Sequence, residues 1–472
     1  MALLLALLLL LPAAQVQKAA PAERPREILE LVARARAVPP EFGADVLLRI
    51  AASGRVADPA WKRELLEEAF HLAAGAREPV RRAAVVTLHN GNSRSNYRAQ
   101  GFDFNLDTLS LQGRAVQAMF PLDRKRALKL LGEVRVPDLP PQTCDDVFAY
   151  RIDDFYTDVV REVADGAFTP EEVRRGENFS LIESYLKDLR SPAQLSPIAT
   201  LLAEAKLTSA QFAQLVQVYS AILANIPSDP RSGEAYWQEA GIQGLARACR
   251  EKGISSFPLL NAYRSFLVRR LSRRCSDSSR IPAERWEMER RTALFSSYDR
   301  SPGDPEIPPI VVKELTVETI KGRYEEPAFW QDPVAKQLHA TLNDLRGRAD
   351  LRADRTQWET RFNEFIGQLA GWTGTSEKSE ADYFHQKALL TWAAFQAAPR
   401  GSFRDGLLRS YVVFLASSGV RQTSPAEWLV QANPVIQLLL SARAEERDEV
   451  LAVIRNAQEP VLWLYAELGR LQ

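Results

Sequence analysis

A signal for the start of a helix returns many times along this chain. Four segments have the form of a capping box, in which Ser or Thr is followed three positions later by Glu or Gln: 169–172, 191–194, 208–211 and 424–427. In a capping box the hydroxyl accepts a hydrogen bond from the third helical amide, and the Glu or Gln side chain bonds back to the amide of the capping residue. Apolar residues at helical spacing follow these signals, so the sequence predicts a long series of α-helices.

The predicted helices show no fixed repeat period. Repeat families with a constant spacing are therefore not indicated. We expect an all-α fold, an irregular α-solenoid in which helical hairpins stack as a superhelix in two blocks. Prolines between Ser301 and Pro309 are incompatible with a helix, so a Pro-rich linker is predicted at 299–330. It divides an N-terminal helical block at 24–298 from a C-terminal helical block at 331–472.

The first residues predict a compartment. Residues 3–11 form an apolar run, and small residues follow it. This pattern is typical of a secretory signal peptide, which we place at 1–20, although no Lys or Arg precedes the run. A short N-terminus lying on a membrane is the alternative. We expect an exported protein, periplasmic or extracellular, with no transmembrane segment in the mature chain, because no later stretch approaches about 20 apolar residues.

The charges of the chain cancel, with 60 basic and 60 acidic residues. No long basic run stands out, so a nucleic-acid partner is not indicated.

Three cysteines are present, Cys144, Cys249 and Cys275. In an oxidising compartment an odd number leaves room for one disulfide and one free thiol. Cys249 falls within a predicted helix and has the setting of a small buried side chain. Cys144 and Cys275 fall at the ends of predicted helices, where a bond can join two elements. We therefore predict a Cys144–Cys275 disulfide.

Four blocks resemble uncharacterised exported bacterial all-helical proteins. They lie at 40–70, 107–112, 144–146 and 168–172. The similarity extends over somewhat more than the first half of the chain. It implies an exported helical protein and brings no activity, cofactor or catalytic residue with it.

Patterns for metal and nucleophile chemistry are incomplete. The four histidines are too far apart in sequence for a zinc motif. Ser184 and Lys187 have Ser-x-x-Lys spacing without the companion motifs of that enzyme class. Residues 103–107 place oxygen ligands at alternate positions, as in an EF-hand, but Thr108 replaces the turn glycine and Arg114 the bidentate Glu. Capping of the next helix by Asn105 or Asp107 is the favoured interpretation, so we expect no catalytic residue, metal or cofactor.

An acidic face is expected on one long predicted helix, at 143–164. Asp146, Tyr150, Asp154 and Asp158 recur there at every fourth position. A solvated surface is the simpler interpretation. Ion binding or contact with a sugar is the alternative; exported helical glycosidases and lyases with an α/α toroid use paired carboxylates.

A polar segment at 89–107 lacks an apolar stripe and is expected to be a long loop. Long loops held by rigid helices often carry binding. The candidate binding residues are His89, Asn92, Asn96, Tyr97 and Asp103. From these features we expect a non-enzymatic exported scaffold that mediates protein–protein interaction in the cell envelope or periplasm. A carbohydrate-active enzyme with an α/α toroid is the alternative.

Overall fold

The structure, a computed structural model, describes most of the chain. The described residues are 24–84, 93–229, 237–275, 301–311, 315–316, 318–320, 330, 332–347, 354–373, 380–422, 424–441 and 444–471.

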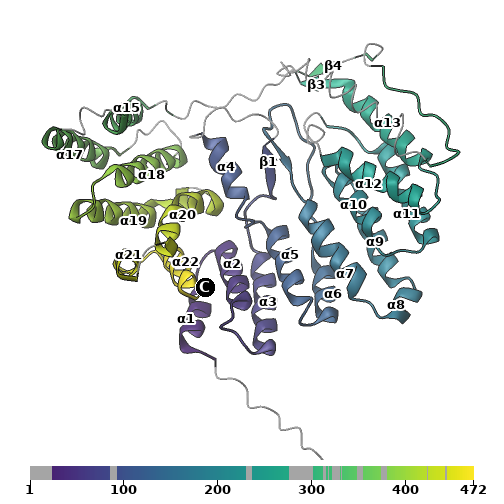
Figure 1. Ribbon diagram of the computed structural model, residues 1–472, viewed down its shortest axis with the longest axis horizontal. Coiled ribbons are helices and arrows are strands. Elements are labelled where there is room, and N and C mark those ends of the chain that lie inside the picture. The colour runs from purple at the N-terminus through teal and green to yellow at the C-terminus, as the bar shows by residue number, and fades with distance from the viewer. Residues whose placement is uncertain are drawn as a thin grey trace, which may run out of the picture.

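The first block, residues 24–275, is built mainly of helices (Figure 1). Among the described residues, three short strands also belong to it, and a fourth strand, later in the chain, pairs with one of them. Its helices are α1 (Arg26–Ala35), α2 (Pro40–Ala52), α3 (Pro59–Ala73), α4 (Arg94–Phe102), α5 (Thr108–Met119), α6 (Arg124–Glu133), the π-helix η1 (Phe155–Val160), α7 (Arg161–Gly166), α8 (Pro170–Arg174), α9 (Glu177–Lys187), the 3₁₀ turn η2 (Pro192–Gln194), α10 (Leu195–Glu204), α11 (Ser209–Asn225), α12 (Trp237–Glu251) and α13 (Phe257–Leu271). Strands β1 (Arg82–Ala84) and β2 (Phe148–Tyr150) pair antiparallel, and β3 (Arg273–Cys275) pairs with β4 (Glu318–Ile320) in parallel.

The second block, residues 332–471, is also helical. Its helices are α15 (Pro333–Gly347), α17 (Arg355–Gly371), α18 (Glu380–Ala397), α19 (Ser402–Gln422), α20 (Pro425–Ser441), α21 (Ala444–Ala457) and α22 (Pro460–Leu471). The all-α class expected from the sequence is therefore confirmed, while the solenoid description stays a prediction.

Capping boxes start the helices where the sequence places them. Three boxes form completely, with Thr169, Ser191 and Thr208 as capping residues. In the fourth, the Ser424 hydroxyl accepts from the amide of Glu427, whose carboxylate accepts instead from Arg98. The side chain of Glu427 therefore contacts Arg98, a residue of the first block.

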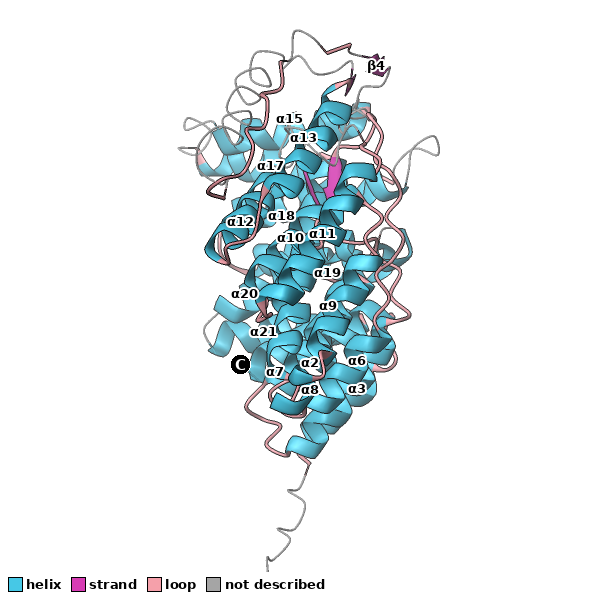
Figure 2. Ribbon diagram, turned by 90° about the vertical axis from the view of Figure 1, so that its right-hand side faces the viewer, coloured by secondary structure: helices cyan, strands magenta, loops and turns pink. Residues whose placement is uncertain are grey.

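The helices stand side by side in a row whose order in space differs from the order in sequence (Figure 1). From α2 the row runs through α3 and α5 towards α10–α13 on one side. Neighbouring helices in the row are in contact, as α2 is with α3 and α3 is with α5. The second block starts at the opposite edge with α15 and α17 and runs inward through α18–α20 to α22, which packs on α1 and α2. Seen at 90°, the helices overlap as in a row viewed from its end (Figure 2).

The two blocks share one continuous apolar core. Phe42 of α2 lies edge-on to Trp428 of α20 and to Tyr465 of α22, with ring centroids 5.8 and 6.2 Å apart. Beside these rings the carboxylate of Asp45, which has no exposed surface, accepts from the Tyr465 hydroxyl at 2.7 Å. The same carboxylate is 2.8 Å from Arg49. A buried charge with several donors of this kind fixes how α22 sits on α2.

The predicted linker is partly a strap on α13. Asp304 accepts from the Ser256 amide at 2.8 Å, and Arg264 donates to the Pro308 carbonyl at 2.6 Å. A short strand of this segment lies at 318–320.

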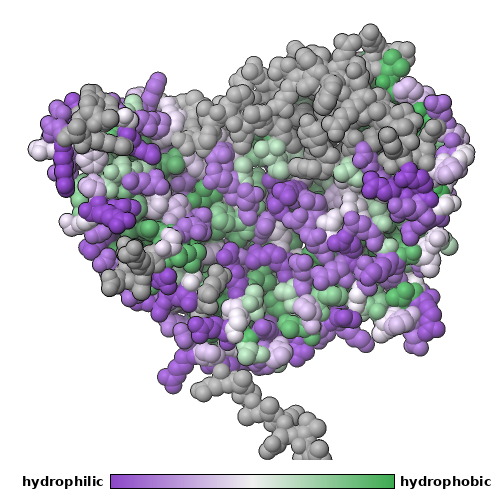
Figure 3. Space-filling model, in the orientation of Figure 1, coloured by the Kyte–Doolittle hydropathy of each residue, from purple (hydrophilic) through white to green (hydrophobic). Residues whose placement is uncertain are grey.

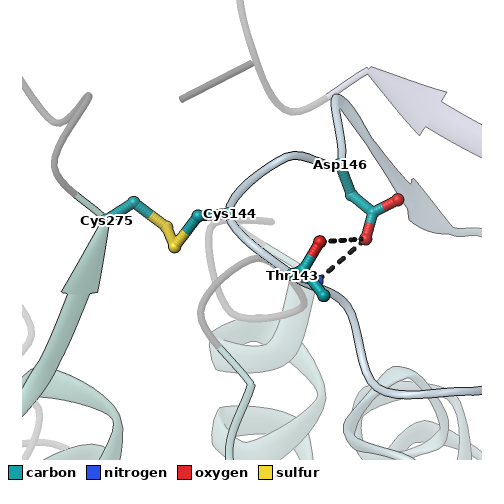
Figure 4. The surroundings of a disulfide bond; sticks show 4 residues. All are labelled: Thr143, Cys144, Asp146 and Cys275. Carbon is teal, nitrogen blue, oxygen red and sulfur yellow. Dashed lines mark hydrogen bonds between the residues drawn. A yellow bond between two sulfur atoms is a disulfide. The ribbon is translucent and has the colours of Figure 1, made fainter. Parts of the chain in front are cut away.

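The predicted long helix at 143–164 is wrong. Residues 144–147 form a turn, closed by Asp146, which accepts from the amide and hydroxyl of Thr143 at 2.8 and 3.1 Å (Figure 4). Residues 148–150 then pair with β1, and the helix begins only at Asp153. Asp146 and Tyr150 therefore do not share a helix face with Asp154 and Asp158.

The predicted disulfide is present in the structure. Cys144 and Cys275 are bonded, with their Cα atoms 5.4 Å apart, and the bond joins the 144–147 turn to β3 (Figure 4). Cys249 is a free thiol with no exposed surface, as expected for a small side chain in a helix.

The described surface is mainly polar. Hydrophilic residues predominate on the face in Figure 3, with hydrophobic residues in smaller patches among them. The described helices include none with the length and apolar character needed to cross a membrane.

Candidate functional site

The prediction of a long loop at 89–107 is wrong for its middle part, because residues 94–102 form the helix α4. The Ser93 hydroxyl accepts from the Asn96 amide at 3.2 Å and starts this helix. Tyr97 is 3% exposed and its ring lies 4.7 Å from that of His385, so it packs inward. Asp103 ends the helix and is exposed. His89 and Asn92 lie outside the described residues.

Two acidic segments singled out in the sequence do meet in space. A small pocket of about 150 Å³ lies between the start of α5 and η1. Asn105 and Asp107 line one wall, and Asp154 and Asp158 line the other. A π-helical turn such as η1 is often found at functional sites.

The carboxylates of this pocket already have protein partners. Asp107 caps α5 by accepting from the amide and hydroxyl of Ser110 at 3.0 and 2.6 Å, and burial raises the pKa of its carboxyl. Asp154 pairs with Arg81, and Asp158 accepts from Thr157 at 3.3 Å. The capping interpretation of Asp107 is therefore confirmed. In the described part of the chain no group of three or more His, Cys, Asp or Glu side chains is placed to hold a metal ion.

A larger groove lies between α1 and the α21–α22 pair. Its volume is about 660 Å³, within the usual range for binding sites. Its walls come from the two ends of the sequence and from the turn after α2. They are formed by Glu27, Glu30, Leu31, Arg34, Arg55, Ile454, Arg455, Gln458, Glu459, Pro460, Trp463, Glu467 and Arg470.

Paired charges organise most of the groove. The Arg34 guanidinium lies 4.0 Å from the centre of the Trp463 ring, a cation–π contact between α1 and α22. Glu467 is within 2.8 Å of Arg455 and 2.7 Å of Arg470. Arg55 is exposed like these arginines but, unlike them, forms no ion pair with any described residue. Its guanidinium is thus available to a ligand.

Glu459 is the titratable group of this groove with a shifted pKa. It stands at the start of α22, accepts from the amide of Leu462, and is 7% exposed. Burial raises the pKa of its carboxyl to about 7. The backbone amides of Val461 and Leu462 at the helix start act against this rise. Shifted pKa values gather at functional sites, although structural groups show them too.

Carboxylates line both walls of the groove. Glu459 and Glu467 are eight positions apart, which corresponds to about 12 Å along the helix axis. Glu27 and Glu30 lie on the wall formed by α1.

Comparison with known proteins finds no match to a family model, to a curated protein or to a solved structure.

Sequence reasoning missed this groove. Trp463 is only half-buried and lines the groove. The spacing of Glu459, Trp463 and Glu467 at every fourth position, on one helix face, was the signal available in the sequence. The opposite wall of the groove is formed by α1, which lies far from α22 in the sequence, so a local pattern does not indicate that the two helices meet.

Proposed function

We propose that this chain is an exported, non-enzymatic helical scaffold that holds a segment of a partner protein in the groove between α1 and α22. The observation that carries the proposal is the groove itself, which presents four arginines and a tryptophan. Arg and Trp are among the residues that most often dominate binding energy in protein–protein interfaces.

Two features support a location outside the cytoplasm. The apolar run at 3–11 is typical of a signal peptide. The Cys144–Cys275 bond is of a kind that persists in oxidising compartments such as the periplasm or the extracellular space.

The arrangement of the helices favours a scaffold over the enzyme alternative. An α/α toroid closes on itself, whereas here the helices α15–α17 and α11–α13 lie at opposite edges of the row (Figure 1).

Charge indicates which partner segment fits. Arg34, Arg455 and Arg470 are paired with glutamates of the protein, so their charge is largely compensated. Arg55 is the exposed cation of the groove that no described carboxylate compensates. The partner segment therefore carries an acidic side chain that meets Arg55, because a charge-assisted hydrogen bond forms there at little cost in desolvation.

The test is capture of the partner with matched variants. The chain from about Lys18, affinity-tagged, is expressed in its native envelope and the captured proteins are identified by mass spectrometry. We expect one stoichiometric partner, whose recovery falls at least about tenfold with Arg55→Glu, a loss of about 1.4 kcal/mol. Arg174→Glu on α8, an exposed site outside the groove, is the control.

The outcomes separate the alternatives. A partner retained equally by both variants would place docking outside the groove. Absence of any stoichiometric partner would contradict the scaffold, and hydrolysis of a glycan or peptidoglycan by the purified chain would favour the enzyme.

A further inference from the structure

A buried histidine lies where the two blocks meet. His385 of α18 has no exposed surface, and its ring packs edge-on against Tyr97 of α4. Its Nε2 is 3.6 Å from a carboxylate oxygen of Glu427 on α20. Neither ring nitrogen has a hydrogen-bond partner among the described residues. Burying a polar group without such a partner costs free energy of folding. The stability of this contact therefore depends on whether the imidazole is neutral or protonated.

Ion pairs surround this ring and join the same three helices. Arg98 of α4 donates to Glu427 at 3.0 Å. Arg94 of α4 donates to Asp382 of α18 at 2.9 Å. We call the contact of α4 with α18 and α20, formed by these four residues with Tyr97 and His385, the joint.

Further groups border the joint. Glu78, before β1, accepts from the amide of Ala426 at 2.8 Å, and burial raises the pKa of its carboxyl. Tyr411 of α19, fully buried, donates to the carbonyl of Gln431 at 2.7 Å. The positive charges facing His385 are those of Arg94 and Arg98, and the negative charges are those of Asp382 and Glu427.

The joint accommodates a neutral imidazole better than a charged one. Burial lowers the pKa of His385 to about 4; Asp382 opposes this change, and Arg94 and Arg98 add to it. When the joint opens, water reaches the ring and its pKa returns towards 6.5. A proton is thus bound more tightly by the open joint than by the closed one.

We propose that the contact of α4 with α18 and α20 is an acid-sensitive joint, which loosens when His385 takes up a proton. The two blocks stay connected by the chain and by the packing of α22 on α1 and α2. This regulation does not depend on the proposed scaffold function.

The sign of the effect follows from linkage. Because the pKa of His385 is lower in the closed joint, closure is fully favoured above about pH 6.5 and loses stability as the pH falls towards 4. Between pH 7 and pH 5 the ratio of open to closed joint rises about 20-fold. Protonation of Glu78 acts in the opposite direction, since its pKa is raised, so the His385 contribution has to be isolated by substitution.

The test is hydrogen exchange on the full chain at pH 7 and pH 5, corrected for the intrinsic pH dependence of exchange. We expect amides of α4, α18 and α20 to lose about 20-fold in protection at pH 5, more than those of α10–α13. His385→Gln, which stays neutral, abolishes this loss. His71→Gln, at an exposed histidine on α3, behaves as the wild type.

Three results would overturn the proposal. These are unchanged protection of α4, α18 and α20 at pH 5, an equal loss in His385→Gln, and a loss spread evenly over both blocks. If His385→Gln does not fold at pH 7, His385→Phe replaces it, because an apolar ring fills the same space against Tyr97.

Discussion

The Cys144–Cys275 bond offers the sharpest test of how this fold is held together. The perturbation is the double variant Cys144→Ala and Cys275→Ala. Both cysteines are almost fully buried, so Ala avoids adding a polar group to the core. The residues lie 131 positions apart, and the bond ties β3 to the 144–147 turn across a stretch that includes η1, η2 and α7–α13.

The magnitude follows from the chain that the bond closes. For a loop of 131 residues, the loss of unfolded-state entropy corresponds to about 5 kcal/mol at 25 °C. Measured values for disulfides are typically about 2–4 kcal/mol, so we expect the free energy of unfolding to fall by about 2–5 kcal/mol.

The assay is urea unfolding followed by far-ultraviolet circular dichroism, for wild type and double variant, each with and without reductant. Reductant should lower the wild-type midpoint to that of the variant and leave the variant unchanged. An identical midpoint in all four samples would refute the assignment of this stabilisation to the bond. A further drop in the reduced variant would point to an effect of reductant unrelated to the disulfide.

Substitutions at three further positions test separate features. Asp107→Ala should lower stability by about 1 kcal/mol in thermal melts, because α5 loses its cap, whereas Asp107→Asn keeps an acceptor and should retain most of it. Tyr465→Phe should cost about 1–3 kcal/mol in urea unfolding, because the buried Asp45 carboxylate loses a donor; an unchanged midpoint would contradict this. The contribution of Glu459 to stability should decline as the pH rises from 4.5 to about 7, since its pKa is raised in the fold. His385 contributes in the opposite direction over this range. The difference in melting temperature between wild type and Glu459→Gln should therefore change with pH across this range, and parallel profiles would argue against the shift.

Local signals predicted most of the helices because their causes are local. Thr169, Ser191 and Thr208 each cap a helix with their own side chains, and each box lies within four residues of sequence. In the second block, α15, α20 and α22 each begin at a proline, which suits the first helical position. Such elements need no information from the rest of the chain.

The failures have tertiary causes. Residues 148–150 have enough helical pattern to extend a helix, but pairing with β1 and the nearby disulfide hold them extended. Tyr97 was placed in a loop because α4 shows little apolar periodicity; its burial depends on His385, which belongs to the other block. The groove was missed for the same reason, since α1 and α22 form it together.

The contact of α2 with α20 and α22 also fixes when the core can be completed during synthesis. Asp45 and Tyr465 are 420 positions apart, and the aromatic neighbours of Phe42 among the described residues lie in α20 and α22. At ribosomal rates of about 5–20 residues per second, these partners of α2 emerge about 20–80 s after it. For that time the side of α2 that carries Phe42 lacks its neighbours from α20 and α22, and the core between the two blocks is complete only once α22 has been made.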